Sequence, residues 1–135
     1  MSRDKNDALP TLARKEVLEA LTERRDLSGA DMRKANLIKV DFSGCKLVGT
    51  NFSYANLKDA NFQGADLRDA SLWNANLEGA DFTNANLEGA DLDYSKLRGA
   101  ILYKANIRRA SLPVDLIPRE DIMRSVEQGG KVSKR

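Results

Sequence analysis

Few side chains of this chain could carry out chemistry. The sequence has no histidine and one cysteine, Cys45. Without histidine the commonest general base, most zinc sites and every histidine-activated nucleophile are excluded. Asp91 and Asp93 are the closest carboxylates that could act as an acid–base pair or bind a hard cation. Each is better interpreted as an ordinary surface position, so we expect no catalytic, cofactor-binding or metal-binding residues and no enzyme.

Length and charge exclude further classes of protein. The chain has 135 residues, of which 41% are hydrophobic and 31% charged, as is typical of one ordered domain. Its 22 basic and 20 acidic residues lack the positive excess of a nucleic-acid binder. No apolar run approaches the roughly 20 residues of a membrane span. A lone cysteine favours a reducing compartment, so we expect a cytoplasmic protein.

The elements that must position any site are set by a five-residue repeat. Large apolar residues recur at every fifth position from Leu27 to Leu112, which makes eighteen repeats without a slip. Two positions before each lies a small residue, mostly alanine, and the position between is mostly Asp or Asn. A period of five fits neither a helix nor a strand, so the chain must turn once per repeat. The small and the large residue then point inward, and Cys45 takes a small-residue position.

The outer positions of each repeat have their own expected roles. An Asp or Asn before the large residue can accept hydrogen bonds from nearby backbone groups. Seven of the nine glycines fall at the last position of a repeat, where a turn with positive φ is expected.

The repeat resembles the pentapeptide-repeat family, whose motif is Ala-(Asp/Asn)-Leu-x-x, over residues 25–114. The resemblance implies an all-β solenoid, a right-handed quadrilateral β-helix with four pentapeptides per coil and about four and a half coils. Residues twenty positions apart should then be stacked neighbours. This spacing predicts an internal ladder of Phe42, Phe62 and Phe82. It also predicts two external columns of alternating charge: Lys58, Glu78 and Arg98, and Arg68, Glu88 and Arg108.

The open ends of such a solenoid need covers. Residues 11–25 predict an N-terminal helix with Thr11 as its N-cap. Its apolar stripe consists of Leu9, Ala13, Val17 and Leu21, with Leu18 beside it. We therefore divide the chain into 1–25, an N-terminal segment with a capping helix; 26–114, the β-helix; and 115–135, a C-terminal helix and flexible tail.

The C-terminal helix is expected to have Pro118 in its first turn and to end at Gly129. Residues 129–135 form the expected tail. Either helix could instead dock on a partner, on a second copy of the chain or on a membrane surface. The C-terminal end could pair two chains, so the expected state is a monomer or a homodimer through that end.

Aromatic residues converge on one predicted face. A coil of twenty residues places Tyr54, Asn74 and Tyr94 in one external column, with Lys34 one coil below Tyr54. Trp73 and Asp93 lie in the neighbouring column. Exposed aromatic rings with flanking charges are typical of binding hot spots, although rings can also simply cover aliphatic atoms. The candidate partner-binding residues are therefore Lys34, Tyr54, Trp73, Asn74, Asp93 and Tyr94. A weaker candidate is the uncharged stripe of Ser43, Gln63, Thr83 and Tyr103.

We interpret the chain as a non-enzymatic protein–protein interaction module, a rigid scaffold that presents a flat solenoid face to a protein partner. The alternative is a DNA mimic that modulates a type II topoisomerase such as DNA gyrase, as in the quinolone-resistance branch of the family. Residues 26–112 contain 11 acidic and 11 basic residues, whereas a mimic needs a dense negative surface. A spacer role is a third interpretation, and direct nucleic-acid binding is disfavoured by the absence of a basic stripe.

Overall fold

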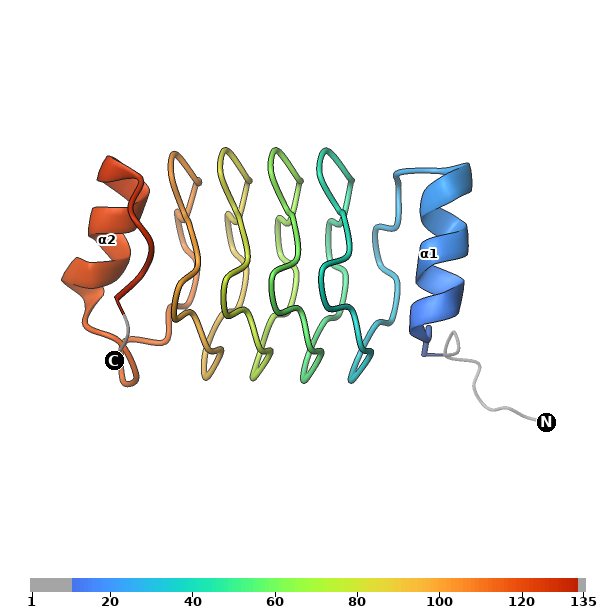
Figure 1. The fold of residues 1–135 in the computed structure, drawn as a ribbon, viewed down its shortest axis with the longest axis horizontal. Coiled ribbons are helices and arrows are strands. Elements are labelled where there is room, and N and C mark those ends of the chain that lie inside the picture. Colours follow the sequence, from blue (N-terminus) through green and yellow to red (C-terminus); the bar gives the residue numbers. More distant parts are fainter. Residues whose placement is uncertain (1–10, 134–135) are drawn as a thin grey trace.

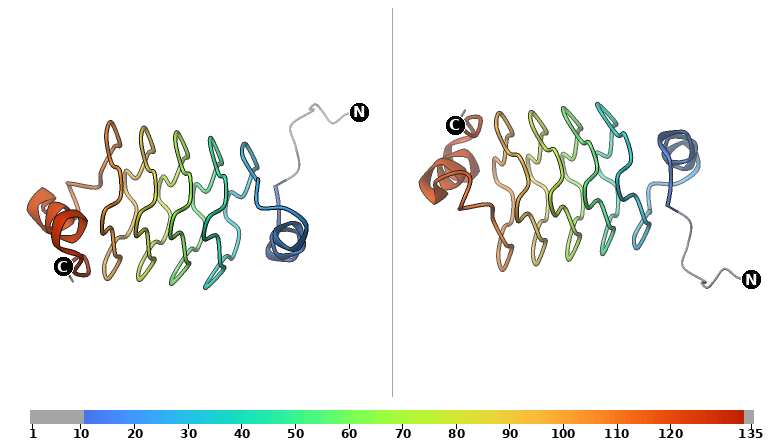
Figure 2. Two further views of the ribbon diagram at one scale, coloured as in Figure 1. Left: turned by 90° about the horizontal axis from the view of Figure 1, so that it is seen from above. Right: turned by 90° about the horizontal axis from the view of Figure 1, so that it is seen from below.

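The computed structural model describes residues 11–133 as a stack of coils with a helix at each end (Figure 1). Helix α1 spans Arg14–Glu23 and helix α2 spans Arg119–Gln128. Within residues 11–133 the β-structure between the helices consists of isolated bridges and not of extended strands. Figure 2 shows from above and below that the coils repeat along one axis.

The coils are joined by backbone pairing between residues twenty positions apart. Parallel bridges of this spacing run from Asp26↔Lys46 to Asp91↔Ser111, which confirms the expected register of four pentapeptides per coil. The N–H of Leu47 donates to the carbonyl of Asp66 over 2.7 Å, and the N–H of Asp66 donates to the carbonyl of Cys45 over 2.9 Å. Backbone groups of each inner coil are thus paired with the coils on both sides.

Each repeat ends in a tight turn. The N–H of Ala30 donates to the carbonyl of Leu27 over 3.1 Å, and the same contact recurs along the solenoid. The residue before the small inward residue lies in the left-handed region, as the glycine spacing predicts: φ is +67° at Gly44, which precedes Cys45. Among residues 11–133, ten residues other than glycine, including Tyr54 and Tyr94, adopt this conformation.

The Asp or Asn side chains close these turns from outside, as expected. Asp41 Oδ1 accepts a hydrogen bond from the Ser43 N–H over 2.9 Å, and Asn51 Oδ1 accepts one from the Ser53 N–H over 3.0 Å. A side-chain oxygen that binds the amide two residues on holds the turn locally. The repeat motif therefore encodes its own turn.

The axis of the solenoid is filled by the large residues. Phe42 and Phe62 stack with ring centroids 5.2 Å apart, and Phe62 and Phe82 with centroids 4.9 Å apart, which confirms the ladder. Phe52 packs edge-on against Phe42 and Phe62. Cys45 is fully buried, and this burial raises the pKa of its thiol, so it acts as a small core residue.

Helix α1 is shorter than the sequence predicts. Thr11 is not its N-cap: the helix is preceded by Ala13, whose N–H donates to Glu16 Oε1 over 3.2 Å, while the Thr11 hydroxyl donates to Asp31. Val17 is fully buried, but Ala13 and Leu18 are exposed. Leu21 packs against the core as predicted, and Ala20 and Leu12, the latter just before the helix, pack there as well. Leu9 and the rest of residues 1–10 lie outside the described residues.

Helix α1 is held to the first coil by polar contacts as well. The N–H of Leu12 donates to the carbonyl of Asp31 over 2.8 Å. Arg14 Nη1 donates to the carbonyls of Asn36 and Ile38 over 3.2 and 2.9 Å. These carbonyls belong to the first coil, which has no coil below it to pair with.

Pro118 is the N-cap of helix α2 and so lies just before the first turn, in which the sequence placed it. The expected stop at Gly129 is confirmed: this residue follows Gln128 as the C-cap with a left-handed φ of 87°. Its buried Ser125 hydroxyl accepts the N–H of Leu102 over 2.9 Å and donates to the carbonyl of Gly130 over 2.5 Å. The carbonyl of Val126 accepts the N–H of Lys104 over 3.0 Å. The helix therefore pairs with amides of the last coil.

The prediction of a flexible tail is wrong for residues 129–133. Lys131 forms an antiparallel bridge with Ile101, and Val132 is buried. The Val132 N–H donates to the carbonyl of Ala100 over 2.7 Å, and its carbonyl accepts the N–H of Gly99 over 3.0 Å. The last coil otherwise has unpaired backbone groups, which attract a strand. Residues 134–135 lie outside the described residues.

Replacing an inward alanine should destabilise the solenoid. Ala75 is 1% exposed, so Ala75→Leu must push extra methyl groups into a filled corner. We expect a loss of about 1–3 kcal/mol in the free energy of unfolding, measured by chemical denaturation. A variant as stable as the wild type would show that this position does not point inward.

The capping role of the C-terminal segment is a prediction that truncation can test. Ending the chain after Gly129 removes the buried Val132 and two backbone hydrogen bonds of the last coil. We expect a loss of about 2–4 kcal/mol in the free energy of unfolding. Ending the chain after Ser133 is the matched control and should leave this free energy unchanged. Equal stability of both truncated chains would contradict the capping role.

Candidate protein-binding face

The predicted binding residues lie on consecutive turns of one side of the solenoid. We call Tyr54, Trp73, Asn74, Asp93 and Tyr94 the aromatic face. The ladder sets their spacing: the Tyr54 N–H donates to the Trp73 carbonyl over 3.0 Å, and the Asn74 N–H to the Asp93 carbonyl over 2.9 Å. Tyr54, Asn74 and Tyr94 all occupy left-handed turn positions, with φ of 63°, 56° and 61°. Their backbone positions are therefore repeated from coil to coil.

The three aromatic rings form a continuous chain of contacts. The Tyr54 and Trp73 ring centroids lie 5.2 Å apart with an interplanar angle of 80°. The Trp73 and Tyr94 centroids lie 5.7 Å apart with an angle of 75°. Tyr54 is 49% exposed and Tyr94 is 55% exposed, whereas Trp73 is partly buried. About half of the surface of each tyrosine is thus available beside the indole.

The polar members of the candidate set are less closely joined. Asn74 and Lys34 are exposed, and neither side chain makes a hydrogen bond, ion pair or ring contact within residues 11–133. Lys34 is linked to the next coil through its backbone, because its N–H donates to the Ser53 carbonyl over 3.0 Å. The structure therefore brings the rings together and places Lys34 beside them without contact.

Asp93 stands in an acidic environment. Its partial burial, together with the charges of Asp91 and Asp115, raises the pKa of its carboxyl above the usual range. The Asp93 N–H donates to Asp91 Oδ1 over 2.9 Å. Within residues 11–133 no lysine or arginine forms an ion pair with any of these three carboxylates. In that same part of the chain no group of three or more acidic or cysteine side chains could hold a metal ion.

The sequence analysis missed two residues that extend the aromatic face. Val114 is 48% exposed and Leu116 is 50% exposed, and both line a shallow pocket with Asp93, Tyr94 and Asp115. Val114 lies twenty positions after Tyr94, so column spacing could have found it although the repeat motif has ended. Nothing in the repeat predicts the exposure of Leu116. The face therefore continues from the rings to an apolar loop.

The second predicted face is occupied by its own contacts. Gln63 Nε2 and the Thr83 hydroxyl both donate to the carboxylate of Asp81, each over 2.6 Å. Tyr103 lies against Gly129, where an added Cβ would approach its ring to 3.2 Å. Because these donors are satisfied within the chain, this stripe offers less to a partner than the aromatic face.

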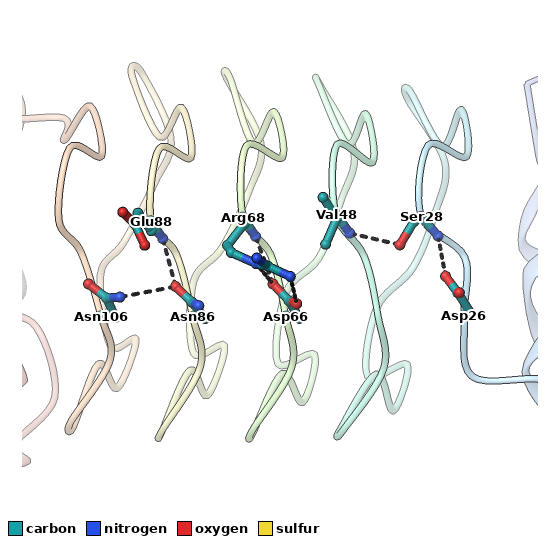
Figure 3. A network of polar contacts seen from close by, with 8 residues as sticks. All are labelled: Asp26, Ser28, Val48, Asp66, Arg68, Asn86, Glu88 and Asn106. Carbon is teal, nitrogen blue, oxygen red and sulfur yellow. Dashed lines mark hydrogen bonds and ion pairs between the residues drawn. The ribbon is translucent and has the colours of Figure 1, made fainter.

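The charged columns form only in part. Arg98 pairs with Glu78 over 3.8 Å, as expected. In the other column Arg68 turns onto Asp66 of its own repeat with two hydrogen bonds, of 2.8 and 2.7 Å, as Figure 3 shows. Glu88 pairs with Arg109, and this hydrogen bond, together with the nearby charges of Arg108 and Arg68, lowers the pKa of its carboxyl. The predicted column of Arg68, Glu88 and Arg108 is therefore present, but its members form no direct ion pair with one another within residues 11–133. The bidentate Arg–Asp geometry is stronger than a stacked single contact, which explains the difference.

Asp93 should make the fold less stable in its charged form. Since its pKa is raised in the fold, the carboxylate costs stability above the unfolded pKa, near 3.8, and the cost disappears below it. We expect Asp93→Asn to raise the free energy of unfolding at pH 7 by less than about 1 kcal/mol and to have no effect at pH 3. Thermal unfolding followed by circular dichroism measures both.

The matched control is the same substitution at Asp41. Hydrogen bonds from the Ser43 hydroxyl and backbone N–H hold the pKa of Asp41 below its usual range, so its charge stabilises the fold at pH 7. Asp41→Asn should therefore lower stability at pH 7, and less so in acid. Destabilisation by both variants would contradict the assigned environment of Asp93.

Comparisons with known proteins agree with this geometry. A family model described as "Pentapeptide repeat region" matches residues 23–92, and a model of eight pentapeptide repeats matches residues 80–112. A comparison with curated protein sequences finds no significant match. No helix within residues 11–133 has the length and apolar character that crossing a membrane requires.

Solved structures of pentapeptide repeat proteins also match this chain. The chain is 36% identical to alr5209, a pentapeptide repeat protein from Nostoc PCC 7120, with a TM-score of 0.69, covering 77% of this chain and 90% of that one. It is 35% identical to HetL, a pentapeptide repeat protein involved in heterocyst differentiation regulation in the same organism. That match has a TM-score of 0.50 and covers 64% of this chain and 44% of HetL.

A third structure, QnrB1, a plasmid-mediated fluoroquinolone resistance protein, is 22% identical with a TM-score of 0.48, and the match covers 81% of this chain and 59% of that one. This likeness is too low to support any functional argument. Relatives above 30% identity and the family models both imply the right-handed quadrilateral β-helix. On these matches and on its twenty-residue register, the chain belongs to the pentapeptide-repeat family.

Proposed function

We propose that this protein is a non-enzymatic scaffold that binds a protein partner through its aromatic face. The observation that carries the proposal is the unbroken chain of Tyr54, Trp73 and Tyr94, with both tyrosines about half exposed. Tyrosine and tryptophan are enriched among the residues that dominate binding energy. Val114 and Leu116 extend the apolar area of the same side.

Rigidity of the scaffold supports the same role. The turns that carry the rings are fixed by backbone bonds between coils, such as the one from Tyr54 to Trp73. A surface that is already ordered loses less conformational entropy when it binds than a flexible loop does. The solenoid is therefore well suited to hold aromatic side chains in position for a partner.

We propose a monomeric, cytoplasmic protein. A homodimer through the C-terminal end is the alternative. It would have to pack on α2 and on Lys131 and Val132, because these residues already pair with or cover the last coil. A DNA-mimic role remains disfavoured by the equal numbers of acidic and basic residues in the repeats.

Affinity capture from a lysate of the source cells tests the proposed function. The bait is the full chain, compared with a variant carrying Tyr54→Ala, Trp73→Ala and Tyr94→Ala. We expect the wild type to retain a protein that the variant loses by at least tenfold. Tyr103→Ala, which removes a tyrosine that is 36% exposed on another face, is the matched control and should retain that protein.

The opposite pattern would contradict the proposal. If the triple variant captured the same proteins as the wild type, the aromatic face would not be the binding surface. Protection of DNA gyrase in a supercoiling assay would instead favour the DNA-mimic alternative.

A further inference from the structure

We infer that the aromatic face binds a proline-rich peptide segment in the polyproline II conformation, laid along the solenoid axis with a basic side chain over Asp93. This inference rests on the proposed function and specifies its ligand. Three independent properties of the face carry it: the spacing of the tyrosines, the unused hydrogen-bond donors and the unpaired acidic end.

The spacing of the rings matches the repeat of such a peptide. Tyr54 and Tyr94 occupy the same turn position two coils apart, which is about 9.6 Å at roughly 4.8 Å per coil. A polyproline II helix rises about 3.1 Å per residue with three residues per turn, or about 9.3 Å per turn. One turn of the peptide therefore spans the distance from one tyrosine to the other.

The uneven exposure of the rings on the aromatic face suits a rigid ligand with a ridged surface. The two tyrosines are more exposed than Trp73, and both meet its ring at steep angles of 80° and 75°. The two tyrosines thus flank a less exposed indole along the column. Proline-rich segments dock on grooves lined by aromatic side chains. A glycan that stacks on several rings at once needs the ring faces to lie in one plane, which these angles do not provide.

The hydrogen-bond donors of the face are unused. Within residues 11–133 the hydroxyls of Tyr54 and Tyr94, the indole N–H of Trp73 and the side-chain amide of Asn74 donate no hydrogen bond. A polyproline II segment has no internal hydrogen bonds, and its carbonyl groups all remain available as acceptors. The unused donors of the aromatic face can therefore pair with the free carbonyl groups of the peptide.

Charge sets the direction of the peptide. At one end Asp93 stands with Asp91 and Asp115, and no cation among the described residues pairs with them. At the other end lies the exposed Lys34. An arginine or lysine of the ligand is favoured beside the carboxylates and repelled by Lys34.

The single tryptophan of the chain is a direct probe of this binding. The probe ligand is a synthetic peptide of nine prolines followed by one arginine, with blocked ends, titrated into the full chain. We expect a saturable change in the emission of Trp73. A peptide of alternating glycine and serine with the same terminal arginine is the control and should cause no change.

Variants then locate the site, with a labelled peptide followed by fluorescence anisotropy. Tyr94→Ala should weaken binding at least tenfold and Asp93→Asn about threefold, with a smaller dependence on salt. Tyr103→Ala and Asp41→Asn are the matched controls and should bind as the wild type does. Circular dichroism shows whether each variant is folded, and Tyr94→Phe, which keeps the ring, should retain most of the affinity.

Two results would overturn the inference. The first is an unchanged Trp73 emission with the proline peptide. The second is a saturable change with cellohexaose in its place, which would assign the face to glycans. If the triple variant still loses a captured protein while no proline peptide binds, only this inference fails. If capture is unaffected as well, the proposed function fails with it.

Discussion

Backbone pairing between residues twenty positions apart is the constraint on which the rest of the molecule depends. Each bridge, such as Asn51↔Ser71, fixes the height of one coil over the next, so equal positions of the repeat become columns. The phenylalanine ladder inside and the tyrosine column outside both follow from this one register. Because every column is built in this way, a face is a property of several coils and not of one local segment.

Most of the fold can be predicted from the sequence, because the repeat encodes packing and turn together. The large residues from Leu27 to Leu102 form the buried core. Asp41 and its equivalents bind the turn, and glycines such as Gly44 mark its left-handed residue. The ends are less predictable, since they lie outside the repeat. Val132 has no motif, and its burial results from the unpaired groups of the last coil.

For the candidate site, the sequence predicts where the residues lie but not which contacts their side chains make. Column spacing predicts that Tyr54, Trp73 and Tyr94 are neighbours. A side chain on the surface can contact several different residues, however, and the spacing does not say which contact forms. Arg68 illustrates this limit: it prefers Asp66 in its own repeat to Glu88 on the next coil. The exposure of Leu116 depends on a loop after the last repeat, which no period describes.

The twenty-residue register also has a consequence for how such chains can change in length. Inserting one pentapeptide between Tyr54 and Trp73 would keep every inward residue inward. It would also move all later residues onto the next of the four sides of the coil. Tyr94 would then leave the column of Tyr54, and the surface would be cut at the insertion. A whole coil of twenty residues would instead lengthen the molecule and keep each side in phase. The core tolerates changes in steps of five, whereas a binding surface that spans several coils tolerates them only in steps of twenty.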